Sequence, residues 1–318
     1  MIKTGVIGCR NLQASELIRV LINHPDVELR WVQDRRNSGK RLDQIVSGIV
    51  GECDLIVVDE AQFDNIELVY LCGNRDEAAR QLSLYPPPDD LRLIDLSGSN
   101  NLRTGAETGW TYGLSEMQRR VLVHEAQRVS VPGNAAMAAM LTLLPMARSL
   151  LLNSPLSLRV GIGTCAWPES EHTLLHMPAK QWANDQQQEV VCALKQCQPN
   201  FDQPVELTIT PLGERRTLAV AARFQCGLEE EKVRQLYEQY YEDHNFVFLV
   251  DRPIVTADVE NTNKCLLNIS KDEQSGLLTV NAVMDVLLKG SAGTAVHAMN
   301  LLFGLHERTG LTLKGTGC

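Results

Sequence analysis

The sequence has no uninterrupted apolar run of membrane-spanning length, no excess of positive charge and no pairing pattern among its cysteines. Its most apolar stretch, AAMAAMLTLLPMARSLLL, is broken by Pro145 and Arg148. The net charge of −9 argues against nucleic acid or an anionic membrane as a partner. Nine cysteines without a C-x-x-C pair disfavour a disulfide framework or a zinc site. We therefore expect a protein of the reducing cytoplasm, and no signal peptide before the strand that opens in MIKTGVIG.

The first part of the chain alternates strands and helices. Residues 2–7 form a short apolar strand, helical spacing follows until Pro25, and VELRWVQ alternates as a second strand that ends at Asp34. Further strands are expected in CDLIVVDE, IELVYLCG and DLRLIDLSG. This order predicts a βαβ unit that opens a Rossmann-type, doubly wound parallel sheet.

From about residue 156 the pattern changes to strands separated by turns. LSLRVGIGTCAW, VELTITPLG and TLAVAARFQC indicate strands, GLEEEKVRQLYEQYYED a helix, and CLLNISKDEQSGLLTVNAVMD a hairpin around Ser275–Gly276. The last stretch, AGTAVHAMNLLFGL, returns to a helix. We expect residues 1–133 with 293–318 to form the Rossmann-like domain, and residues 134–292 an inserted α+β domain on a mixed or antiparallel sheet, with substrate and oligomerisation roles.

A dinucleotide site is suggested by Gly5 and Gly8 after the first strand. The full fingerprint needs a further glycine where this sequence has Asn11, and the side chains of Asn11 and Arg10 would intrude where phosphate oxygens rest. Arg35 and Arg36, just past the second strand, resemble a site for a 2′-phosphate, although exposed arginines are common there.

Glycines near the C-terminus offer a second place for an anion. Gly290 and Gly293, in KGSAG, precede a helix whose N–H groups could cradle a phosphate. The alternative is that this segment only connects a domain to the helix.

The stretch VPGNAAMAAMLTLLP indicates a turn that opens into a buried helix, with Asn134 at its entry. Free N–H groups and the positive end of the helix dipole make that place suitable for a thiolate or an anion. An amide is a poor nucleophile, so we expect Asn134 to be the helix N-cap.

Other side chains could carry chemistry. Cys165 in GTCAWP is either a relocated nucleophile or a packing cysteine at the end of a strand. His172 and His176 have the spacing of one helix face, but without a third ligand we expect no metal site. His297 in the last helix is expected to be a satisfied core or interface histidine.

Several stretches together resemble the N-acetyl-γ-glutamyl-phosphate reductases of arginine biosynthesis. They are ELIRVLINHPDVEL, LIDLSG, YGLSE, VPGN with its helix, DVENTNKC and, as the most specific, LLKGSAGTAVHAMNLLFGL. The resemblance implies a Rossmann domain completed by the C-terminal helix and an inserted domain for catalysis and subunit contacts. It also implies an oxidoreductase that uses NADP(H) on an acyl phosphate, with a cysteine nucleophile and a histidine that moves protons.

The residues that the family pattern requires differ here. Asn134 stands where the nucleophilic cysteine is expected, and Gln186, with Asn184 beside it, where the family has histidines. Asn101 stands where the family has an arginine that contacts the substrate. Arg75 and Asp76 stand where the family has a histidine and a glycine, and the carboxylate of Asp76 would repel a phosphate. The glycine-rich substrate loop is reduced to GIGTCAWPESE.

We interpret the chain as a catalytically impaired homologue of this family, a pseudoenzyme that acts as a binding or partner subunit. Its partner would be a second copy or an active relative. The alternatives are an active NADP(H)-dependent reductase with a rearranged site, and a sensor of a nucleotide or another small metabolite. The ligand, the partner and the retention of NADP(H) binding are left open by the sequence.

Overall fold

The structure is a computed structural model, and it describes residues 1–73, 75–102, 109–168 and 178–315. The chain divides into two compact units. The first contains residues 1–132 and Ser291–Thr312, and the second contains most of the residues between them together with residues 313–315. No described helix is long and apolar enough to cross a bilayer.

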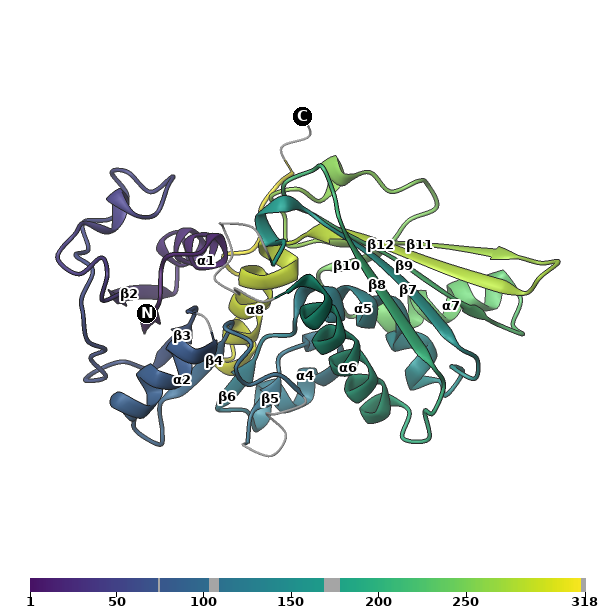
Figure 1. Ribbon diagram of the computed structural model, residues 1–318, viewed down its shortest axis with the longest axis horizontal. Helices are drawn as coiled ribbons and strands as arrows, with labels where there is room; N and C mark the ends of the chain where they lie inside the picture. The colour runs from purple at the N-terminus through teal and green to yellow at the C-terminus, as the bar shows by residue number, and fades with distance from the viewer. Residues whose placement is uncertain (74, 103–108, 169–177, 316–318) are drawn as a thin grey trace. The chain divides into compact units, whose positions relative to one another are not determined.

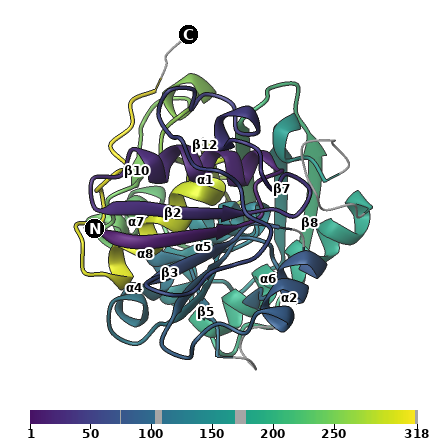
Figure 2. The same ribbon diagram turned by 90° about the vertical axis from the view of Figure 1, so that its left-hand side faces the viewer.

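The first unit is built on a six-stranded parallel sheet in the order β2-β1-β3-β4-β6-β5 (Figure 2). The strands are β1 Ile2–Ile7, β2 Val27–Gln33, β3 Leu68–Leu71, β4 Arg92–Asp95, β5 Thr111–Tyr112 and β6 Arg128–Ser130. The helices are α1 Leu12–Ile22, α2 Arg75–Leu84, α4 Ser115–His124 and α8 Gly293–Leu302. A short 3₁₀ helix, η1, spans Leu42–Gln44. The predicted Rossmann-type sheet is confirmed.

Helices cover both faces of this sheet. Helices α1 and α4 each contact α8, and α1 also contacts β2. On the other face, Ala78 of α2 lies in one apolar cluster with Val69 and Leu93. Because both faces are buried, the central strand β3 is apolar throughout, which is typical of parallel sheets.

The second unit is built on a mixed sheet in the order β10-β11-β12-β9-β7-β8 (Figure 1). The strands are β7 Leu156–Ile162, β8 Val205–Pro211, β9 Thr217–Gln225, β10 Val247–Leu249, β11 Cys265–Asp272 and β12 Leu277–Asp285. The helices are α5 Asn134–Arg148, α6 Ala179–Cys197 and α7 Glu230–Tyr241. Two 3₁₀ helices, η2 Thr164–Ala166 and η3 Thr256–Asp258, and a π-helical turn, η4 Leu288–Ala292, complete the list. The predicted α+β architecture is confirmed.

Helix α5 is the centre of the second core. Every residue from Ala135 to Ala147 is buried, so the helix is apolar on all sides. It contacts β7, β9 and β12 of the sheet and also α6 and α7. The hydroxyls of Tyr237 and Tyr241 on α7 each donate a hydrogen bond of 2.5 Å to carbonyl oxygens of α5, those of Thr142 and Leu141.

Candidate functional site

The loop after β1 occupies the place where this class of sheet binds phosphates. Gly8 has φ +88°, and a β-carbon there would lie 2.7 Å from the backbone nitrogen of Gly73 in the loop after β3. Asn11 caps α1: its side-chain oxygen accepts from the N–H of Ala14 at 2.7 Å, and its amide donates to the Cys72 carbonyl at 2.8 Å. The two loops are therefore in direct contact, and the N-terminus of α1 is already capped.

Arg10 lies in the same loop and joins two carboxylates. Its Nε donates to Asp34 Oδ2 at 2.9 Å, and its Nη2 donates to both oxygens of Glu77 at 2.9 and 2.7 Å. The side chains of Arg10, Asp34 and Glu77 are 19%, 1% and 29% exposed. Burial and the Asp34 carboxylate raise the pKa of the neighbouring Cys9 thiol to about 12. We call these three residues the Arg10 bridge.

Of the remaining dinucleotide candidates, Gly5 has a packing partner in the core, whereas the side chains of Arg35 and Arg36 are exposed. Gly5 lies within β1 and not after it, and a β-carbon there would lie 2.2 Å from the Trp31 indole, so this glycine makes room for a ring of the core. The N–H of Arg36 donates to the other oxygen of Asp34 at 3.0 Å. Arg35 is exposed beside Asp34.

In the second unit, the N-terminus of α5 is covered by side chains of α6. Gln186 Oε1 accepts from the N–H of Ala136 at 3.1 Å, and Glu189 Oε1 accepts from the N–H of Gly133 at 2.9 Å. Gln186 and Glu189 are 5% and 1% exposed. The Gln186 amide packs so closely that a β-carbon on Gly133 would lie 2.2 Å from its Nε2.

The expectation that Asn134 caps this helix is corrected by the structure. Gly133 is the N-cap, Asn134 is the first helical residue, and its side-chain oxygen accepts from Ala135 N–H at 2.8 Å. The capping acceptors come from another helix because α6 packs against this end of α5. Asn184 lies on the exposed side of α6.

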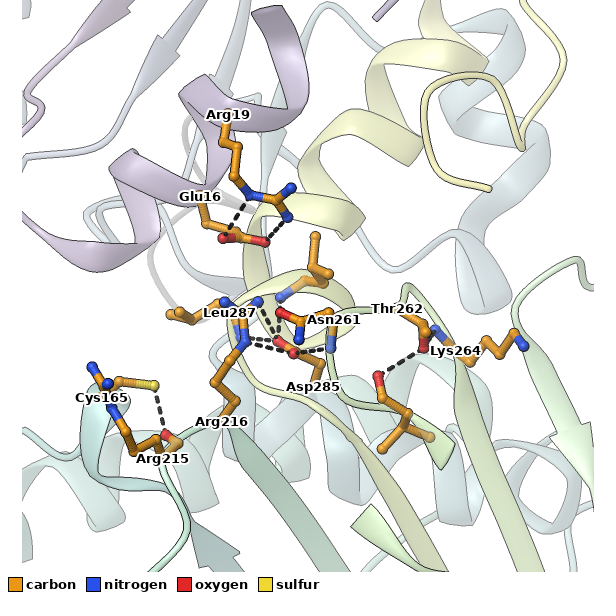
Figure 3. Close-up of polar contacts among 12 residues, drawn as sticks. Glu16, Arg19, Cys165, Arg215, Arg216, Asn261, Thr262, Lys264, Asp285 and Leu287 are labelled. Atoms are coloured by element: carbon orange, nitrogen blue, oxygen red, sulfur yellow. Dashed lines mark hydrogen bonds and ion pairs between the residues drawn. The ribbon is translucent and has the colours of Figure 1, made fainter. Parts of the chain in front are cut away.

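Cys165 lies in η2, just past the end of β7, and its thiol donates to the backbone carbonyl of Arg215 at 2.6 Å (Figure 3). The side chain is buried, and desolvation raises its pKa to about 11. A nucleophilic cysteine needs the opposite environment, in which the thiolate is stabilised. These surroundings favour packing.

Next to it, Arg216 forms a two-point ion pair with the fully buried Asp285, at 2.7 and 3.1 Å (Figure 3). Oδ1 of Asp285 also accepts from the N–H groups of Leu287 and Leu288 in the turn that leads into η4, and its Oδ2 accepts from the N–H of Asn261 in the segment before β11. The expected turn KGSAG is this buried π-helical segment continued into α8, and Gly290 and Gly293 are buried within it.

The loop after β4, where Asn101 replaces the expected arginine, is organised by a buried carboxylate. Asp95 accepts from the backbone and hydroxyl of Ser97 and from the backbone and side chain of Asn100. Burial raises the pKa of Asp95 despite these bonds. Asn101 follows directly and is buried. Arg75 and Asp76 begin α2, so Asp76 and Glu77 place two carboxylates in its first turn.

His297 is a satisfied core histidine, as expected. Its Nδ1 lies 3.0 Å from the Ser115 hydroxyl and its Nε2 lies 2.7 Å from Glu307 Oε2. All three side chains are buried, so this Ser–His–Glu arrangement ties α4 and α8 together and offers no access to a substrate. His172 and His176 lie outside the described residues, and among the described ones there is no cluster of three metal-ligating side chains.

Sequence reasoning missed Glu77, which accepts from Arg10, and Glu189, which accepts from the N–H of Gly133. Glu189 had a detectable signal, because it lies one helical turn after Gln186 and points to the same face. Glu77 is 67 residues from Arg10, so no local pattern could pair them.

Comparisons with known proteins agree with this architecture. Residues 3–124 match the family described as semialdehyde dehydrogenase, NAD binding domain, and residues 186–285 match semialdehyde dehydrogenase, dimerisation domain. Aspartate semialdehyde dehydrogenase II of Vibrio cholerae, complexed with ASA, superposes with a TM-score of 0.73 at 13% identity, over 96% of this chain and 98% of that one. The enzyme of Candida albicans with NADP gives 0.69 at 13% identity, over 95% and 98%. The fold is that of the semialdehyde dehydrogenases.

Full-length relatives define the family more narrowly. The chain is 33% identical to N-acetyl-γ-glutamyl-phosphate reductase of Parabacteroides distasonis and 34% identical to that of Phocaeicola vulgatus, in each case over 99% of both chains. The chain belongs to the N-acetyl-γ-glutamyl-phosphate reductase family.

Proposed function

We propose that this member of the family no longer carries out acyl transfer and acts as a binding or partner subunit. The proposal rests on the N-terminus of α5. There the side chains of Gln186 and Glu189 accept hydrogen bonds from backbone N–H groups, and the first helical residue is an amide, Asn134. The reaction implied by the resemblance needs a thiolate at residue 134 and a proton carrier at residue 186. An amide does not form a thioester, and glutamine does not titrate near neutral pH.

Cys165 does not supply the missing nucleophile in this proposal. Its thiol is buried, donates to a carbonyl oxygen and has a pKa raised to about 11. At neutral pH the thiolate fraction is about 100-fold below that of a thiol with the ordinary pKa of 9.0.

A role in assembly is supported by the second sheet. The face opposite α5–α7 carries small and polar side chains in register across neighbouring strands: Asn268, Asn281, Ala221, Arg159 and Thr208. All five are half-buried or exposed. Because the matched family for residues 186–285 is a dimerisation domain, we propose that this face binds a second copy or an active relative.

The catalytic part is tested by phosphate-dependent NADP reduction with the semialdehyde of the family reaction, with the Parabacteroides distasonis relative assayed in parallel. We expect no turnover above background from folded protein, judged by circular dichroism. Robust turnover would refute the proposal, and its loss in Cys165→Ala would then identify that thiol as the nucleophile.

The assembly part is tested by light scattering after size-exclusion chromatography. We expect wild type to be oligomeric and Ala221→Arg, in the middle of the open face, to dissociate it, since an unpaired charge in an interface is costly. Gln239→Arg, exposed on α7, is the matched control and should leave the mass unchanged. A wild-type monomer that also fails to associate with an active relative would refute this part.

A further inference from the structure

We propose that the Arg10 bridge takes the place of a dinucleotide in the first unit. In this fold such a ligand lies at the carboxyl ends of the strands, with its pyrophosphate on the loop after the first strand and its ribose on an acid after the second. Arg10 follows β1 and Asp34 follows β2, so the bridge spans those two positions. Glu77, in the first turn of α2 after β3, anchors the other side.

The charges of the bridge oppose a phosphate. The guanidinium makes three hydrogen bonds to two carboxylates, so its charge is already compensated within the protein. The three side chains together carry one net negative charge, and in the same helical turn the charge of Asp76 is offset by that of Arg75. A dinucleotide would have to displace Arg10 from both carboxylates and then face them.

The shape of the loops opposes it as well. The loops after β1 and β3 follow neighbouring strands, and the side chain of Asn11 lies between them and donates to the Cys72 carbonyl. The Asn11 side chain also takes the N–H of Ala14, one of the groups with which α1 would hold a phosphate. These residues do not fit a dinucleotide phosphate.

The Arg10 bridge instead connects the segments that follow β1, β2 and β3, which a bound dinucleotide would otherwise contact. Asp34 is almost fully buried, so without Arg10 its carboxylate would lose its only side-chain cation partner among the described contacts. We therefore expect the first unit to be stable without a nucleotide. It rests on the proposed loss of reductase function, but it fails separately: dinucleotide binding without turnover would contradict only the bridge, whereas turnover would contradict the proposed function.

The test compares thermal unfolding of the full chain for wild type, Arg10→Ala and the control Arg19→Ala. Arg19 is a matched control because it pairs with a single carboxylate, Glu16, on the same helix and is 34% exposed. We expect Tm to fall by about 5 °C in Arg10→Ala and by about 1 °C in Arg19→Ala. Should Arg10→Ala fail to fold, Arg10→Lys is compared with Arg19→Lys, because a single ammonium cannot reproduce the forked contact.

The same proteins are then heated with NADPH, NADP⁺, NADH or NAD⁺ at about 1 mM. We expect no rise in the wild-type Tm, whereas a ligand with a Kd of about 10 µM would raise it by about 5 °C or more. A dinucleotide-dependent rise for wild type overturns the inference. So does an equal loss of stability in the two arginine variants.

Discussion

The acceptor role of Gln186 can be tested by removing its amide while keeping its volume. Gln186→Leu leaves the buried N–H of Ala136 without the acceptor that now lies at 3.1 Å. An unsatisfied buried N–H costs about 1–3 kcal/mol, so we expect unfolding free energy to fall by about 2 kcal/mol. Gln186→Ala also creates a cavity next to Gly133, and we expect a loss of about 3–4 kcal/mol.

Urea unfolding followed by circular dichroism measures both losses, provided that the slope m is unchanged. Asn184→Ala is the control, because this residue lies on the same helix and is exposed; its effect should stay within about 0.5 kcal/mol. If Gln186→Leu is as stable as the control, the amide does not cap α5, and the site is free to serve another group.

Three further outcomes follow from buried groups. Because burial raises the pKa of Cys165 to about 11, we expect iodoacetamide to modify it at neutral pH about 100-fold more slowly than in the unfolded chain, by peptide mass spectrometry; an equal rate would refute the raised pKa. Burial lowers the pKa of His24, so stability should be full above pH about 6.5 and fall as the pH drops below it; the fall in Tm towards pH 5 should be smaller in His24→Gln than in the exposed control His124→Gln, and equal slopes would contradict this. Tyr237→Phe removes the bond to the Thr142 carbonyl and should cost about 1–2 kcal/mol in urea unfolding, whereas no loss would show that the bond contributes nothing.

Much of the fold could be predicted because strand and helix periods are local properties. The βαβ opening, the strands of the second sheet and the hairpin at Ser275–Gly276 all follow from neighbouring residues. The stretch CDLIVVDE was predicted as a strand, but the structure has only single bridges there, at Ile56 and Val58. An apolar run fixes burial without fixing pairing, so this segment packs without joining the sheet as a strand.

The helix that carries Gln186 could have been predicted but was not. In α6 the buried positions Trp182, Gln186, Glu189, Ala193 and Cys197 recur every three or four residues, which is a helical period. Two of these positions are polar, and a polar side chain in a core position weakens the apolar pattern. The same two side chains, Gln186 and Glu189, accept hydrogen bonds from N–H groups at the start of α5. The polar residues that interrupt the apolar pattern of α6 are therefore the ones that form the site.

The hydrogen bonds on which the proposed function depends join residues that are far apart in the chain, so they cannot be predicted from a single sequence. A reductase has to keep polar groups available for its substrate and cofactor, and such groups reduce stability while they wait for a ligand. Here Gln186 and Glu189 satisfy one such place within the second unit, and the Arg10 bridge satisfies another within the first. If either unit had kept a site for a ligand, we would expect N–H groups or charged side chains there to lie without a protein partner, available to that ligand. In both units these groups are satisfied by side chains of the same unit, which is what the proposed role as a binding or partner subunit predicts.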